Sequence, residues 1–192
     1  MRAARELFLE RGYAGTTVEA ISDRSDVPPA TVYRLFSSKL GILKAVLDVS
    51  IAGDDDAVPV PERPQVQSLF ATSDPREQVA GFVGVTRDIN SRAAPVYQIL
   101  VSAAAADADA ASLLAELTRQ RHDGQRRIAR SLARRGALRP PLRQRDAEDL
   151  IHALMSPEIY RLLVVDRGWT PERYAEWLSS TLVDQLLAVR SR

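Results

Sequence analysis

The sequence predicts an all-α protein of about nine helices, in which a small helix-turn-helix domain precedes a larger helical domain. Apolar residues recur at spacings of three and four along nearly all of the 192 residues, which is the periodicity of amphipathic helices. Valine, isoleucine and threonine form no alternating runs of the kind that predicts a strand. The helix-turn-helix is expected within the first fifty residues, where short helical segments are separated by tight turns.

Composition excludes several classes of protein. The chain has no cysteine, which excludes a disulfide scaffold and a cysteine nucleophile or metal site. Its two histidines, His122 and His152, leave little material for a metal centre, and no nucleophile–base pair or glycine-rich phosphate loop is recognisable. The longest apolar run, residues 99–106, is too short to span a bilayer. No secretion signal is expected, because the first residues contain no apolar h-region. We expect a cytoplasmic protein with no catalytic residues, no metal or cofactor and no membrane partner.

Four short helices are expected in the first fifty residues. They cover approximately residues 2–11, 17–24, 28–35 and 39–49. Gly12 ends the first helix, as glycine commonly does. Thr16 is expected to cap the second, with Glu19 reaching back in a capping box. Pro28 and Pro29 open the third, because proline suits the first turn of a helix.

A proline-rich stretch divides the chain. Residues 52–64 contain three prolines and the acidic triplet at 54–56, which is typical of a linker. We therefore expect an N-terminal domain at 1–51 and a second domain at 65–192. The triplet is interpreted as a solvated loop rather than a metal site, because metal ligands need a spacing that converges on one point.

Longer helices are expected beyond the linker. One starts after Pro75, a second starts at Pro95, and a long one runs from about 109 to 135 until Gly136 stops it. The last two segments cover 146–163, with a break at Ser156-Pro157, and 170–189, with Thr170 as cap. Both carry apolar residues over a wide arc, which indicates two partners for each helix. A second subunit is one candidate for the second partner.

Eight arginines lie between positions 126 and 145. Cations are favoured at the C-terminus of a helix, so a solvated helix end explains them. A second DNA contact is the alternative.

The helix-turn-helix is the sharpest functional signal, because its second helix is the element that enters the DNA major groove. The first fifty residues carry 7 basic and 6 acidic side chains, so only a local arrangement could bind nucleic acid. Helix N-termini suit phosphate, and Thr16 and Thr17 add hydroxyls there. Tyr33 could reach a phosphate from the groove edge, and Lys39 stands at a helix start, where a cation is placed only for an anion. Packing of Tyr33 and solvation of Lys39 are the alternatives.

Base reading is expected from residues 28–34. Pro28, Pro29 and Ala30 are small or apolar and could contact thymine methyl groups, and Thr31 could contact a methyl or a phosphate. Arg34 has the fork that guanine prefers, although a phosphate contact or a solvated side chain remains open. The remaining apolar residues of this helix, Val32, Leu35 and Phe36, are assigned to packing.

Two stretches, R-G-Y-A-G-T-T-V-E-A-I-S and V-P-P-A-T-V-Y-R-L-F-S-S-K, carry a resemblance to a known family. Over residues 3–49 the chain resembles the N-terminal domain of the TetR family of transcriptional regulators. The resemblance implies a three-helix DNA-binding domain joined to a helical ligand-binding and dimerisation domain, with tyrosine and lysine at positions 33 and 39 as phosphate contacts. The chain departs from the family pattern at Asp26, where glycine is common, at Pro28, where a capping residue is usual, and at Leu35, where an aromatic is frequent.

The last two helices of that family form a four-helix dimer interface, which implies a set of apolar interface residues here. The candidates are Leu154, Ile159, Leu162, Trp177, Leu178, Thr181, Leu182 and Leu186. A ligand cavity could be lined by Phe82, Tyr97, Leu100, Leu113, Leu117 and Tyr160, although plain core is the alternative.

Together these features predict a homodimeric repressor that a small molecule releases from a palindromic double-stranded operator. The scarcity of buried charge favours an apolar or aromatic effector. The alternative is a DNA-binding regulator without an effector, constitutive or gated by a protein partner.

Overall fold

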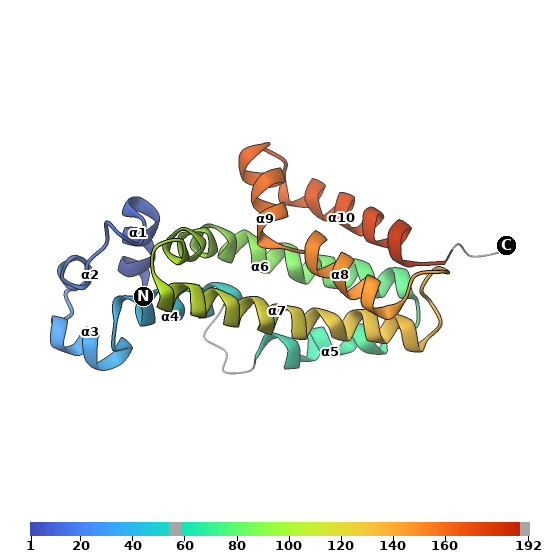
Figure 1. The fold of residues 1–192 in the computed structure, drawn as a ribbon, viewed down its shortest axis with the longest axis horizontal. Helices are drawn as coiled ribbons and strands as arrows, with labels where there is room; N and C mark the ends of the chain where they lie inside the picture. The colour runs from blue at the N-terminus through green and yellow to red at the C-terminus, as the bar shows by residue number, and fades with distance from the viewer. Residues whose placement is uncertain (54–58, 189–192) are drawn as a thin grey trace. The chain divides into compact units, whose positions relative to one another are not determined.

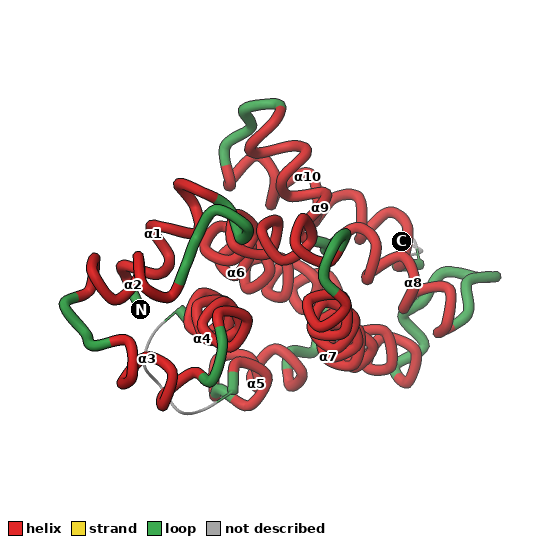
Figure 2. Tube along the Cα trace, turned by 60° about the vertical axis from the view of Figure 1, so that its left-hand side comes forward, coloured by secondary structure: helices red, strands yellow, loops and turns green. Residues whose placement is uncertain are grey.

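The computed structural model describes residues 1–53 and 59–188, and within them the chain is all-α (Figures 1 and 2). It contains ten α-helices: α1 (Arg2–Arg11), α2 (Val18–Ser25), α3 (Pro29–Phe36), α4 (Lys39–Ala52), α5 (Pro64–Ala71), α6 (Pro75–Ala104), α7 (Ala108–Arg134), α8 (Gln144–Leu154), α9 (Pro157–Tyr160) and α10 (Pro171–Leu186). A 3-10 turn, η1 (Val60–Glu62), precedes α5, and a π-helical segment, η2 (Arg161–Asp166), follows α9. The only extended pairing in the described ranges is an isolated bridge between Leu138 and Leu187. The acidic triplet at 54–56 lies outside the described residues.

The helices form two compact units. The first comprises Met1–Asp55 and Arg92–Leu117, and the second comprises Asp56–Ser91 and Thr118–Arg192. Residues 92–117 therefore pack with the N-terminal helices. The N-terminal domain predicted from the proline-rich linker, residues 1–51, did not include them. Because α6 and α7 are each continuous, both helices contain residues of both units.

The core of the first unit draws on α1 to α4 and on the parts of α6 and α7 that belong to this unit. The buried apolar residues of this cluster are Ala4, Leu7, Phe8, Val18, Ile21, Val32, Ile42, Leu43, Val46, Leu47, Val96, Leu100, Ala103, Ala110, Leu113 and Leu117. Val32 is the only fully buried residue that α3 contributes. Since so little of α3 is used for packing, most of its surface remains available for a partner.

The cap of α2 differs from the prediction by one residue. Thr17 is the N-cap, and its hydroxyl oxygen accepts a hydrogen bond from the Ala20 amide at 3.1 Å. Thr16 is buried, and its hydroxyl lies 3.1 Å from the Leu7 carbonyl oxygen and 2.8 Å from that of Gly12. The prediction of Thr16 as cap was therefore wrong, because Thr16 instead ties the end of α1 to the start of α2.

Two further predictions, a helix start at Pro95 and the extent of the linker, were also wrong. Pro95 does not start a helix but lies inside α6, where it is exposed. A proline inside a helix removes one backbone hydrogen bond, and the helix-forming residues on both sides carry α6 past it. The sequence analysis also missed α5, which begins at Pro64 inside the stretch assigned to the linker.

The stop predicted at Gly136 and the helix starts predicted at Ser156-Pro157 and Thr170 are confirmed. Gly136 has φ +63° just after α7. Ser156 caps α9 by accepting from the Ile159 amide at 3.3 Å, and Thr170 caps α10 by accepting from the Arg173 amide at 3.2 Å. These caps fix α8, α9 and α10 as separate elements.

In the second unit, α10 is a core helix. Its buried residues are Tyr174, Leu178, Leu182, Val183 and Leu186, and it contacts α8 and η2. Three of the residues predicted for a dimer interface, Leu178, Leu182 and Leu186, are therefore covered by the same chain. No helix in the described ranges is both long enough and apolar enough to cross a membrane.

Candidate nucleic-acid interface

The turn between α2 and α3 is closed by local hydrogen bonds. Asp26 adopts the left-handed conformation at φ 54° and ψ 37°, a conformation that aspartate tolerates better than most residues. The Ser22 hydroxyl donates to the Val27 carbonyl oxygen at 2.6 Å, and the Val27 amide donates to the Ser22 carbonyl oxygen at 3.3 Å. The helix-turn-helix therefore survives without the glycine that is common at this position.

The recognition helix α3 exposes the side chains from which base reading is expected. Pro28, Pro29, Ala30 and Arg34 are exposed, and Thr31 is half-buried. Tyr33 is 46% exposed, so its phenol is not a core aromatic. No side chain caps the helix at Pro28, which leaves its N-terminus open to an approaching acceptor.

Leu35 corrects one packing assignment. It was expected to pack together with Val32 and Phe36, but its exposed fraction is 58%. Val32 and Phe36 do pack on the core of the first unit. An exposed leucine on the recognition helix adds an apolar contact to the candidate interface.

Lys39 lies near Tyr13, twenty-six residues earlier in the chain. Its Nζ donates to the Tyr13 carbonyl oxygen at 2.8 Å and lies 4.2 Å from the centre of the Tyr13 ring. The sequence argument that only an external anion could explain a cation at this helix start was therefore wrong, since a carbonyl oxygen and a π face stabilise it. An ammonium group has three donors, so a phosphate contact remains possible.

The two threonines have different roles. Because Thr16 is buried and its hydroxyl lies between two carbonyl oxygens, it cannot offer that hydroxyl to a phosphate. Thr17 is exposed, and it accepts a hydrogen bond as the cap of α2. Its own O–H is still a donor, so Thr17 alone of the pair stays in the candidate interface.

An ion-pair network that the sequence analysis missed joins α1 to α2. Arg24 donates to both carboxylate oxygens of Glu10, each at 3.2 Å, and Glu6 lies 3.8 Å away. The hydrogen bond from Arg24 lowers the pKa of Glu10 below its usual value. Spacing within one helix could not reveal this contact, because its partners are fourteen residues apart.

The residues predicted to line an apolar ligand cavity pack against neighbouring side chains. Leu100, Leu113 and Leu117 belong to the core of the first unit, and Tyr97 packs against it. In the second unit, Phe82 packs on Phe70 with ring centres 4.9 Å apart, and Tyr160 packs on Tyr174 at 5.0 Å. The two pockets described below are lined by other side chains, so a cavity lined by these six residues stays a prediction, with plain core as the alternative.

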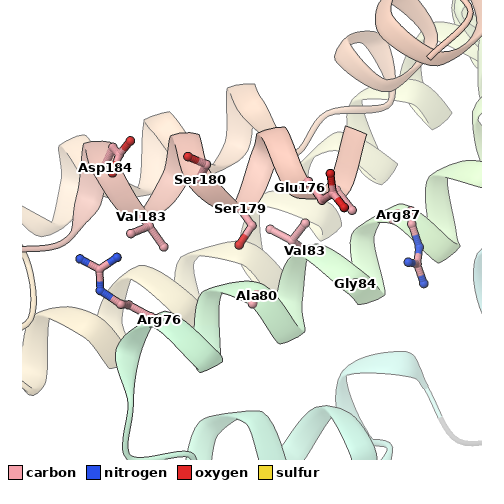
Figure 3. Close-up of a pocket in the computed structure, with 11 residues that line it drawn as sticks. Arg76, Ala80, Val83, Gly84, Arg87, Glu176, Ser179, Ser180, Val183 and Asp184 are labelled. Carbon is pink, nitrogen blue, oxygen red and sulfur yellow. The ribbon is translucent and has the colours of Figure 1, made fainter. Parts of the chain in front are cut away.

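The larger pocket is a groove of about 570 Å³ between α6 and α10 in the second unit (Figure 3). It is lined by Arg76, Ala80, Val83, Gly84, Arg87, Ala175, Glu176, Ser179, Ser180, Val183 and Asp184. Small side chains form its floor, and charged side chains stand at its margins.

The interface residues that stay accessible lie on α8, α9, η2 and one side of α10. Leu162 is 44% exposed, and Leu154, Ile159, Trp177 and Thr181 are half-buried. Val165, also on η2, is 60% exposed and was missed because the predicted segment ended at residue 163, whereas η2 continues to Asp166. These residues replace the buried leucines of α10 as the candidate dimer surface.

Comparisons with known proteins agree with this geometry. The family described as bacterial regulatory proteins, tetR family, matches residues 1–46. The uncharacterized HTH-type transcriptional regulator YdeS of Bacillus subtilis is 30% identical over 166 residues, covering 85% of this chain and 76% of YdeS.

Two solved structures share the fold. The SmeT–triclosan complex has a TM-score of 0.73 at 19% identity, covering 98% of this chain and 90% of SmeT. FadR from Bacillus subtilis in complex with stearoyl-CoA has a TM-score of 0.70 at 17% identity, covering 95% of each chain. With the helix-turn-helix at its N-terminus and a relative that matches most of its length, the chain belongs to the TetR family of DNA-binding transcriptional regulators.

Proposed function

We propose that the protein is a repressor that binds a palindromic operator as a homodimer and releases it when a small molecule binds the second unit. The observation that carries the proposal is the surface of α3, where the candidate base- and phosphate-contacting side chains are exposed and only Val32 is fully buried. Two copies of α3 related by a two-fold axis would read two half-sites in successive major grooves.

A contact within the first unit supports a route from the effector to the DNA. Arg92 on α6 donates from Nε to the Ser50 carbonyl oxygen at 3.1 Å and from Nη2 to that of Ile51 at 3.2 Å. These carbonyls belong to the last turn of α4, the helix that follows α3. Since α6 also contains residues of the second unit, a ligand that shifts α6 would pull on the end of α4. The ligand must prefer one of the two states for this to release DNA.

Relatives support an effector of some kind. SmeT has been solved with triclosan and FadR with stearoyl-CoA. The runner-up function is a regulator with no effector, constitutive or gated by a protein partner. The burial of Leu100, Leu113 and Leu117 in the core of the first unit is compatible with it.

The function is tested by selecting binding sites from a random duplex library. We expect the enriched sequences to be inverted repeats bound by two subunits. A thermal-shift screen against metabolites should then identify a compound that raises the melting temperature, as any ligand of the folded state does, and lowers operator affinity. Single, non-repeated sites would contradict the two-fold model, and a compound that stabilises the protein without releasing DNA would favour the effector-free alternative.

Replacing Lys39 with glutamine should lower the slope of log K against log salt by about one unit, because one counterion-releasing contact is lost. Glutamine can still donate to the Tyr13 carbonyl oxygen, so the local fold is kept. Lys44→Gln is the matched control, since Lys44 pairs with Asp48 at 2.8 Å on α4. Equal slopes for Lys39→Gln and the wild type in an anisotropy titration would remove Lys39 from the interface.

Replacing Arg34 with alanine should cost about 1–3 kcal/mol on the cognate operator if Arg34 reads a guanine. The same variant should lose much less on an operator changed at that base pair, because the contact is already absent there. Competition binding with the two duplexes measures the difference. Equal losses on both would assign Arg34 to the phosphate backbone.

A further inference from the structure

The second unit contains a pocket of about 350 Å³ between α5 and the C-terminal half of α7, helices that lie side by side in Figure 1. Its lining consists of Gln67, Phe70, Arg127, Arg130, Ser131, Arg134 and Arg135. Four of these seven residues are arginines, and none of the described residues in the lining is acidic.

The helix dipole does not account for this charge. Cations are favoured only within the last turn of a helix, and that turn of α7 contains Arg134. Arg127 and Arg130 lie further upstream, at spacings of three and four from one another and from Arg134, where like charges destabilise a helix. None of the ion pairs identified in the described ranges involves the four arginines of the lining.

Two of the arginines are held in place. The Arg127 guanidinium lies 5.0 Å from the centre of the Phe70 ring, and Arg135 donates to the carbonyl oxygens of Phe70 and Thr72 at the end of α5. Arg130 and Arg134 are exposed. A site with two fixed guanidinium groups loses less conformational entropy when it binds an anion.

The lining also contains a buried polar side chain, Ser131, which is hydrogen-bonded to Gln78 behind it. Gln78 is buried, and its Nε2 donates to the Leu69 carbonyl oxygen at 3.0 Å and to the Ser131 hydroxyl oxygen at 3.1 Å. Ser131 is itself buried and belongs to the lining. This network orients a hydroxyl next to the arginines.

We propose that this arginine pocket binds a phosphorylated small molecule. Guanidinium groups bind phosphate oxygens through two parallel hydrogen bonds. Several guanidinium groups around one pocket therefore fit a diphosphate better than an anion with a single charge. The volume lies within the range of small-molecule sites, whereas a DNA backbone needs an extended basic surface rather than a compact pocket. The site goes beyond the proposed function, and its chemistry differs from that of the apolar or aromatic effector expected from the sequence.

The test is calorimetric titration of the DNA-free protein with inorganic pyrophosphate and, separately, with ADP. Arg130→Gln/Arg134→Gln should weaken the binding of both by at least about tenfold, because charge-assisted hydrogen bonds are lost. The matched control, Arg119→Gln/Arg126→Gln, removes two exposed arginines of the same helix that lie outside the lining, and it should bind within about twofold of the wild type. The pocket variant should melt no lower than the wild type, because two like-charge pairs on α7 are relieved.

Three results would overturn the proposal. The first is no heat of binding for either probe at about 1 mM, the weak limit for a small ligand. The second is an equal loss in the control variant, which would mean that the probes respond to bulk charge. The third is unchanged pyrophosphate and ADP binding in the pocket variant together with a DNA salt slope lowered by about two units, which would assign these arginines to a second DNA contact. Because the titrations contain no DNA, their outcome does not depend on whether the protein is a repressor.

Discussion

Replacing Leu182 with aspartate should unfold the subunit rather than only separate a dimer. Leu182 is 2% exposed and packs inside the second unit. Removing a buried leucine side chain costs about 2–5 kcal/mol, and an unpaired buried carboxylate adds to that cost. The total stability of a domain is about 5–15 kcal/mol, so little or none would remain. Circular dichroism should show loss of helix at temperatures where the wild type is folded.

Leu162→Asp is the matched change at an accessible position. Leu162 is 44% exposed on η2, so the subunit should keep its helical content. If the candidate dimer surface is correct, sedimentation should show a shift from dimer to monomer at micromolar concentration, with weaker operator binding. A Leu182→Asp variant that stays helical and becomes monomeric would instead restore Leu182 to a subunit interface, and a Leu162→Asp variant that stays dimeric would remove Leu162 from it.

The contrast between these two leucines shows where pattern-based prediction reaches its limit. The apolar residues of the last helix cover more of its circumference than one neighbour requires, and this was visible in the sequence. Which arc faces the same chain depends on where α8 and η2 lie, and periodicity within α10 does not contain that information. The arc with the strongest leucine repeat is the one that packs inside the unit.

Most ends of the N-terminal helices were predicted to within one residue because each helix has a local start or stop signal, although α4 ends three residues beyond the predicted end at 49. α1 ends next to Gly12, α3 begins at Pro29, and α4 begins after the cap Ser38. The error at Thr16 came from two adjacent threonines, of which either could cap α2. Only the carbonyl oxygens of α1, brought close by folding, decide that Thr16 is the buried one.

Proline and lysine misled the sequence analysis for related reasons. Pro95 carries the signal of a first helical turn, but the same residue is compatible with an exposed site inside a helix whose neighbours are good helix formers. Lys39 opposes the dipole of its own helix, and the group that stabilises it is the Tyr13 carbonyl oxygen. For Lys39 the deciding partner lies twenty-six residues away, outside the window in which a local pattern is read. For Pro95 the same local signal is compatible with two outcomes, a helix start and a site inside a helix.

Replacing Ala30 with glutamate should abolish operator binding while leaving the protein at least as stable. Ala30 is exposed and is the second residue of α3, after Pro29. A carboxylate in the first turn of a helix is favourable by about 0.3–1 kcal/mol, so the melting temperature should not fall. On DNA the same carboxylate would face phosphates and the base acceptors of the major groove, and like-charge contacts cost several kcal/mol. We expect operator affinity to fall by at least about a hundredfold, or about 2.8 kcal/mol.

The control for Ala30→Glu is Gln65→Glu, because Gln65 is exposed and is the second residue of α5, directly after Pro64. It changes the net charge by the same amount in the same position of a helix, but in the second unit. We expect it to bind the operator like the wild type, apart from a small effect that disappears at higher salt. An equal loss in both variants would attribute the effect to net charge alone. An Ala30→Glu variant that still binds the operator would show that the N-terminus of α3 does not enter the groove.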